Sequence, residues 1–140
     1  MRIRACILRR VKADLATFFQ ALGDPTRLRL LNLMARGEAC VCYFVEVLGE
    51  PQPKISRHLA YLRRNGIVSA RREGKWMHYR INDPRDPAVA RVLETTLAAF
   101  AEDKQMQRDR AAFERACCST RLSGVLQYAP KPELARPRGE

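Results

Sequence analysis

The stretch GEACVCYFVEVLGEPQPKISRHLAYLRRNG (Gly37–Gly66) contains two helical patterns separated by a short turn. Residues 41–48 carry apolar side chains at helical spacing, and the GEPQP sequence that follows predicts a turn. The second pattern covers 53–65, where Pro53 suits the first helical turn and an Asn-Gly pair marks the end. Two helices joined this closely predict a helix-turn-helix. The apolar stripe of the second helix consists of Ile55, Leu59 and Leu62.

Residues 67–81 (IVSARREGKWMHYRI) change from helical to strand periodicity. The segments 67–72 and 76–81 are rich in aromatic and β-branched residues, which favour strands. Between them the sequence Glu73-Gly74-Lys75 predicts a tight turn. We therefore expect a β-hairpin that carries basic residues near its tip.

Helices are also predicted on both sides of this unit. Residues 13–22 and 25–36 carry apolar residues at helical spacing, and Asp24 suits the N-cap of the second helix. Residues 87–116 predict one long helix, whose apolar residues can pair with a second copy in a dimer. The sequence after Ser119 is rich in proline and lacks periodicity, which predicts a mobile tail.

The net charge of +11 is unevenly distributed over the 140 residues. Residues 1–12 carry five basic and no acidic side chains, and residues 53–80 carry eight basic and one acidic side chain. Clustered Lys and Arg bind polyanions by releasing counterions from phosphates, so the charge predicts a nucleic-acid partner. We expect three parts: a basic arm (1–12), one domain for DNA binding and dimerisation (13–116), and a cysteine pair with a flexible tail (117–140).

Polar side chains on the early turns of a recognition helix read the major groove of DNA. Basic side chains on an adjacent hairpin hold phosphates or reach the minor groove. The predicted DNA-binding residues are Gln52, Lys54, Ser56, Arg57 and His58 on the helix, and Arg71, Arg72 and Lys75 on the hairpin.

The sequence shows no membrane segment. No apolar run approaches the roughly 20 residues needed to span a bilayer, and we find no signal-peptide pattern. We therefore expect a cytoplasmic protein with no membrane partner.

The five cysteines favour metal binding or redox sensing over structural disulfides in a cytoplasmic chain. Cys40 and Cys42 lie at the start of the predicted helix 41–48, whose N-terminus favours the thiolate form. Side chains two residues apart on a helix point about 200° apart, so both thiols meet one ion only if the first turn is distorted. The alternative interpretation is that both are small buried apolar residues.

A soft trivalent metalloid such as arsenite takes three thiolates. Cys40 and Cys42 supply two of them, and position 45 is Val45. The third thiolate must therefore come from elsewhere in the chain. Cys117 and Cys118, at the end of the predicted long helix, are candidates for this site or for the start of a separate one.

From Leu22 to Ile81 the sequence resembles the ArsR/SmtB family of winged-helix repressors, most closely its arsenic-responsive branch. The resemblance rests on LGDPTRLRLLNLM, CVC, QPKISRHLAYLR and REGKWMHYR. It implies a mainly α fold with a β-hairpin wing, a winged helix-turn-helix that dimerises through terminal helices. It also implies a repressor, not an enzyme, that binds double-stranded operator DNA as a homodimer and is released by As(III) or Sb(III), with no organic cofactor.

The resemblance implies that Cys40 and Cys42 are metalloid ligands. The third cysteine of the best-known family pattern is absent here. Some family members bind arsenite with cysteines at the end of the dimer helix. The resemblance therefore implies Cys117 or Cys118 as the third ligand. Cadmium and lead sensors of the family recruit N-terminal cysteines, which makes Cys6 the alternative.

Three other functions are compatible with the sequence. A repressor that responds to Cd(II), Pb(II) or Zn(II) would be marked by a four-thiolate site that includes Cys6. A redox repressor would be released when its cysteines oxidise to a disulfide. A thiol enzyme is disfavoured, because the sequence has no C-x-x-C beside a βαβ pattern and no pairing of nucleophile and base.

Overall fold

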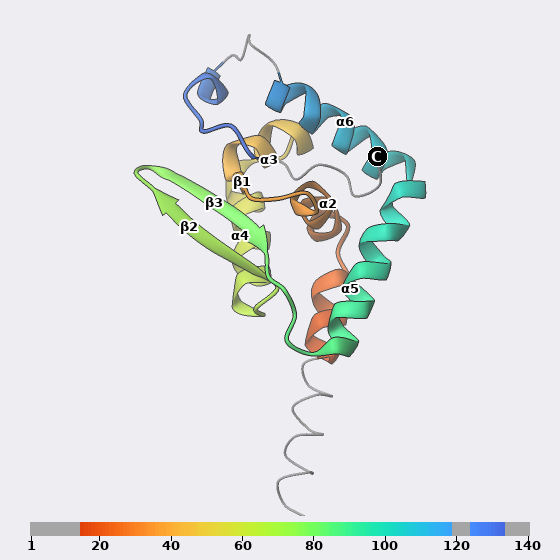
Figure 1. Ribbon diagram of the computed structural model, residues 1–140. Coiled ribbons are helices and arrows are strands. Elements are labelled where there is room, and N and C mark those ends of the chain that lie inside the picture. The colour runs from red at the N-terminus through yellow and green to blue at the C-terminus, as the bar shows by residue number, and fades with distance from the viewer. Residues whose placement is uncertain (1–14, 119–123, 134–140) are drawn as a thin grey trace, which may run out of the picture.

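The computed structural model describes residues 15–118 and 124–133. Helical residues 15–22 come first, followed by α2 (Pro25–Met34), β1 (Ala39–Cys40), α3 (Val41–Leu48), α4 (Gln52–Arg64), β2 (Val68–Glu73), β3 (Trp76–Ile81), α5 (Pro87–Ala99), η1 (Phe100–Glu102), α6 (Lys104–Cys118) and η2 (Gly124–Gln127). In Figure 1, α2 lies in the middle, with the sheet on one side and α5 and α6 on the other. Among the described residues, no helix has the length and apolar character that a bilayer crossing requires.

The predicted helix-turn-helix is confirmed. α3 covers the predicted residues 41–48 and ends at Gly49, whose φ of 65° lies in the left-handed region where glycine carries no steric penalty. α4 begins at Gln52 and has a proline in its first turn. The three apolar residues of its predicted stripe are fully buried. α4 is therefore anchored through one face and leaves the opposite face outside.

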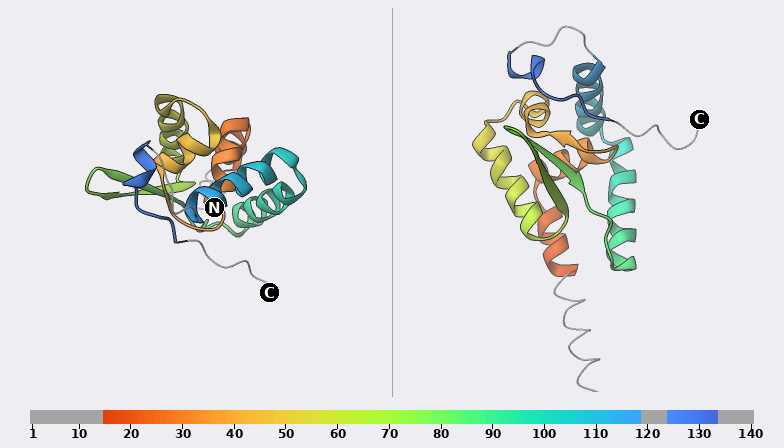
Figure 2. Two further views of the ribbon diagram at one scale, coloured as in Figure 1. Left: turned by 90° about the horizontal axis from the view of Figure 1, so that it is seen from above. Right: turned by 60° about the vertical axis from the view of Figure 1, so that its left-hand side comes forward.

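The predicted hairpin is also confirmed and forms the wing. β2 and β3 pair antiparallel, with Val68 opposite Ile81 and Glu73 opposite Trp76. Gly74, with φ of 58°, forms the tight turn between them. Figure 2 shows the hairpin projecting from the body of the molecule.

β1 is an element that the sequence does not predict. Its two residues are too short to show a periodic pattern, and they form a strand because Ala39 pairs with Tyr79 and Cys40 pairs with His78. The sheet order is β1-β3-β2. The first cysteine of the CVC sequence is therefore part of the same sheet as the wing.

The prediction of one helix over 87–116 is wrong. α5 leads into η1, and Asp103 then has extended backbone with φ of −88° and ψ of 125° before α6 begins. The Asp103 carboxylate accepts a hydrogen bond from the Met106 amide at 3.0 Å, which caps the first turn of α6. Phe100, Met106 and Phe113 are all buried, so apolar residues occur on both sides of the break and make it hard to recognise in the sequence.

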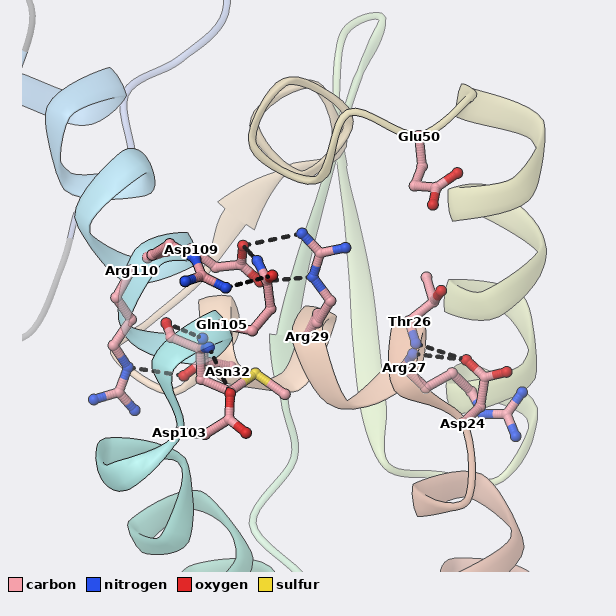
Figure 3. A network of polar contacts seen from close by, with 12 residues as sticks. Asp24, Thr26, Arg27, Arg29, Asn32, Glu50, Asp103, Gln105, Asp109 and Arg110 are labelled. Carbon is pink, nitrogen blue, oxygen red and sulfur yellow. Dashed lines mark hydrogen bonds and ion pairs between the residues drawn. The ribbon is translucent and has the colours of Figure 1, made fainter.

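A buried polar network fixes α6 to α2 (Figure 3). Arg29 donates to the Asp109 carboxylate from Nε at 2.7 Å and from Nη2 at 3.0 Å. Asn32 donates to the Met106 carbonyl at 3.0 Å and accepts from Arg110 Nε at 2.9 Å. Asp109 and Asn32 are only 3% and 1% exposed, so these bonds satisfy polar groups that would otherwise be costly to bury.

The described residues 124–133 contain η2, in a region for which the sequence predicts a mobile tail. η2 packs against α3, and Leu126 and Ala129 are both buried. Leu126 lies in η2 and Ala129 lies just after it, and a search for α-helical periodicity does not detect so short an element. The predicted basic arm (1–12) and Cys6 lie outside the described residues.

Candidate DNA-binding surface and thiol site

The N-terminal turns of α4 lie on the outside of the molecule, beside the wing (Figure 1). Gln52 and Arg57 are exposed, whereas Lys54 and Ser56 are half-buried. Lys54 Nζ lies 3.0 Å from the Glu50 carboxylate, one turn earlier in the chain. Gln52 and Arg57 are therefore the predicted reading residues that are most open to a DNA groove.

His58 has a different environment from the other predicted DNA-binding residues. Its ring lies against the start of α2, with Nδ1 3.4 Å from Arg27 Nη1 and 3.8 Å from Asp24 Oδ1. Its side chain is only 17% exposed. Burial lowers the pKa of His58, with the neighbouring cations acting in the same direction and Asp24 opposing them. In the structure His58 therefore packs α4 against the start of α2.

Arg27 is a residue that the sequence analysis does not select. Its Nε donates to the Ala21 carbonyl at 2.7 Å, and its Nη2 donates to the Gln20 carbonyl at 3.0 Å. The same guanidinium lies 4.3 Å from the centroid of the Tyr61 ring on α4. Arg27 thus ties the end of the first helix to α4. The sequence does offer one indication of this role: Arg27 lies one turn after the predicted helix end at Gly23, and its amide donates to the cap residue Asp24.

The wing carries three predicted basic residues in two environments. Arg71 donates to the Glu38 carboxylate from Nη2 at 2.6 Å and from Nε at 3.0 Å, and this pairing lowers the pKa of Glu38. Arg72 and Lys75 are exposed near the tip, where Lys75 Nζ lies 4.9 Å from the centroid of the Trp76 ring. Arg72 and Lys75 are therefore more available to DNA phosphates than Arg71.

The two thiols of the CVC sequence converge. Cys40 has extended backbone with φ of −71° and ψ of 142° and occupies the N-cap of α3, while Cys42 lies inside the first turn. This change of backbone brings the two Sγ atoms to 3.5 Å. Cys40 is fully buried and Cys42 is half-buried. Burial, together with the hydrogen bond and charge of Cys40, raises the pKa of Cys42 to about 12.

The predicted cysteine pair at the end of α6 is split between two environments. Cys117 is half-buried and packs against the core, whereas Cys118 is exposed. Burial raises the pKa of Cys117 to about 11, with Cys118 and Glu114 acting in the same direction. α6 packs on α3, and the Tyr43 and Phe113 rings meet edge to face with centroids 6.0 Å apart. This contact brings the C-terminal part of α6 against the helix that carries Cys42.

Tyr43 is a second residue that the sequence analysis misses. It is fully buried, and its hydroxyl is the buried side-chain polar atom without a hydrogen-bond partner among the described residues. Burial raises the pKa of Tyr43, and the thiolate charges of Cys117, Cys40 and Cys42 raise it further. The phenol therefore lies within electrostatic range of all three thiols. Within residues 15–118 and 124–133, no three potential ligand side chains are gathered closely enough to hold a metal ion.

An anchored helix with an exposed polar face, preceded by a short turn and flanked by a basic hairpin, defines a winged helix-turn-helix DNA-binding protein. The chain belongs to the arsR family of bacterial regulatory proteins, whose sequence pattern matches residues 24–70. It is therefore a transcriptional repressor and not an enzyme. The family resemblance and the fold predicted from the sequence are both confirmed.

Two relatives and one solved structure document this membership. The chain is 49% identical to the arsenical resistance operon repressor of Escherichia coli over 103 residues, which cover 72% of this chain and 86% of the relative. It is 51% identical to a probable mercury resistance operon repressor of Streptomyces lividans over 109 residues, 78% of each chain. The homodimeric winged helix-turn-helix domain of Mb0332 from Mycobacterium bovis matches with a TM-score of 0.56 and 31% identity, over 67% of this chain and 84% of that domain.

The names of these two relatives mention arsenic in one case and mercury in the other. Family membership alone therefore does not select an inducer. That choice has to be argued from the thiols of this chain.

Proposed function

We propose that this chain binds operator DNA as a homodimer and is released when As(III) or Sb(III) binds Cys40, Cys42 and Cys117. The observation that carries the proposal is the 3.5 Å separation of the Cys40 and Cys42 sulfur atoms. Metal–thiolate bonds of about 2.3 Å can join both sulfurs to one ion in a bent arrangement, whereas a linear ion would need a gap of about 4.6 Å. The pair thus suits a pyramidal, three-coordinate metalloid.

Cys117 is the third ligand that the packing favours. It belongs to the helix that packs on α3, and its half-buried thiol faces the core, whereas the Cys118 thiol is exposed. The three thiols do not form a ready-made site, so binding must draw the end of α6 toward α3. Such a movement links the occupied site to a change in helix packing.

Charge balance favours a trivalent metalloid over a divalent cation. Arsenous acid and three thiols form a neutral tris-thiolate complex and three water molecules. A divalent cation with the same three thiolates keeps one negative charge, and an unpaired buried charge is costly. Cys40 is fully buried, so a neutral complex suits this site better than a charged one.

The DNA-binding part of the proposal rests on exposed polar side chains. On α4 these are Gln52 and Arg57, and on the wing Arg72 and Lys75. In addition, we propose a link from the thiols to this surface, because Cys40 pairs with His78 of the wing strand β3. A coupling free energy of about 1–3 kcal/mol between the two sites would weaken DNA binding by roughly 5- to 150-fold.

The test is fluorescence anisotropy of the reduced protein on DNA from upstream of its own gene, at fixed salt. Arsenite, antimonite, Cd(II) and peroxide are titrated separately. We expect release by arsenite or antimonite, and no release of the double variant Cys40→Ser/Cys42→Ser by either. Release by Cd(II) but not by arsenite would establish a divalent-cation sensor instead, and release by peroxide alone would establish a thiol-redox repressor.

A further inference from the structure

Tyr43 stands out because its hydroxyl is buried without a hydrogen-bond partner in the part of the chain that the structure describes. Leaving a buried hydroxyl unpaired costs about 1–3 kcal/mol, so native proteins rarely keep one without a use. Tyr43 directly follows Cys42 on α3, and its ring packs on Phe113, one turn before Cys117. The residue therefore stands between the two segments that carry the thiols.

We propose that the Tyr43 hydroxyl donates a hydrogen bond to a metalloid-bound thiolate and thereby favours the occupied site over the empty one. This inference rests on the function proposed above and adds a positioning residue to that site. Sulfur bound to the metalloid is an acceptor without a proton of its own, whereas the protonated thiols of the empty site are poorer partners. Binding therefore gives the hydroxyl an acceptor that it lacks beforehand.

The arrangement of α3 and α6 supports this assignment over a purely structural role. The ring of Tyr43 accounts for the packing on Phe113, and phenylalanine would make the same contact. The hydroxyl, in contrast, has no hydrogen-bond partner within residues 15–118 and 124–133. After burial, the charges of Cys117, Cys40 and Cys42 are what raise the pKa of this hydroxyl.

The test uses Tyr43→Phe, which removes the hydroxyl and keeps the ring. We expect arsenite affinity, measured by calorimetry on the reduced full-length protein, to fall by about 5- to 10-fold, the effect of one lost hydrogen bond. DNA affinity without metalloid should stay the same, and the thermal midpoint of the empty protein should not fall. The matched control is Tyr79→Phe, a half-buried tyrosine of β3, for which arsenite affinity should not change.

Two results would overturn the inference while the proposed function stands. Equal arsenite affinity of wild type and Tyr43→Phe would show that the hydroxyl does not contact the occupied site. A lower thermal midpoint of the empty variant would show that the hydroxyl already has a partner, such as a buried water. Failure of the wild type to bind arsenite would remove both the inference and the proposed function.

Discussion

The thiol site and the DNA-binding surface provide opposite environments within one small domain. Cys40 and Tyr43 are fully buried, whereas Gln52, Arg57 and the tip of the wing are exposed. A buried site gains by forming a neutral complex, while a surface that binds a polyanion needs charges that the phosphates can reach. Substitutions in the first region should therefore change the response to the inducer, and substitutions in the second should change DNA binding itself.

The largest effect is expected where α6 is fixed to α2. Asp109→Ala leaves Arg29 without its partner in a largely buried pair, and we expect the free energy of unfolding to fall by about 3 kcal/mol. Urea denaturation measures this directly. Glu114→Ala is the matched control. Glu114 also lies on α6 and pairs with Arg36, but its side chain is half exposed, so its removal should lower the free energy of unfolding by less than about 1 kcal/mol. Equal losses would mean that burial does not distinguish the two pairs.

The second prediction separates the two adjacent cysteines of α6. Cys117→Ser should raise the arsenite concentration needed for half-release of DNA by roughly 100-fold, the upper range of a typical coupling between two sites. Cys118→Ser, next to it but exposed, should leave that concentration unchanged. Anisotropy titrations of both variants make the comparison. A larger increase for Cys118→Ser than for Cys117→Ser would assign the third ligand to Cys118. If neither substitution changed the arsenite concentration, Cys6 would become the candidate for the third ligand.

The third prediction concerns the outward face of α4. Arg57→Ala should weaken DNA binding by about tenfold and reduce the slope of log affinity against log salt by about 1, because one phosphate or base contact is lost. Its response to arsenite should remain. The control is Arg108→Ala, which removes the same charge from an exposed position on α6 and should change neither the DNA affinity nor its salt dependence. A similar loss in both variants would mean that only net charge matters.

The smallest effect is a pH dependence at the contact between α4 and α2. The folded state lowers the pKa of His58 through burial and the cations Arg27, Lys54 and Arg57, with Asp24 opposing. The unfolded chain therefore takes up this proton first as pH falls below the ordinary value of about 6.5, and the free energy of unfolding should decrease. His58→Gln should lose less stability than wild type between neutral and acidic pH. Unfolding curves at both pH values test this, and parallel losses would contradict it.

Local sequence patterns predict the DNA-binding half of the molecule well. Apolar residues at helical spacing, bounded by turn residues, predict α3 and α4. Segments rich in β-branched and aromatic residues on either side of a turn predict the hairpin. All of these patterns involve residues that are close together in the chain. The break at Asp103 is missed because buried apolar residues, Phe100 before it and Met106 and Phe113 after it, occur on both sides. A single capping carboxylate is a weak signal beside so many apolar residues.

The thiol site depends on contacts between distant segments, and the sequence predicts it only in part. If both cysteines belonged to one helix, its first turn would have to be distorted for the thiols of Cys40 and Cys42 to meet. In the structure the helix instead begins at Val41, and pairing with β3 holds Cys40 extended. The sequence also does not predict that the Tyr43 hydroxyl is buried without a hydrogen-bond partner among the described residues, because this depends on how distant segments pack around it.

The pairing of β1 with β3 has a consequence for how this protein should be dissected. It joins the strand that contains Cys40 to the wing strand β3 through main-chain groups, and every amino acid other than proline supplies the same amide and carbonyl. An alanine scan would therefore detect ligands and DNA contacts but would leave this connection intact and unnoticed. Replacing a single amide of β1 by an ester removes a main-chain donor without altering any side chain, and makes the connection itself accessible to experiment.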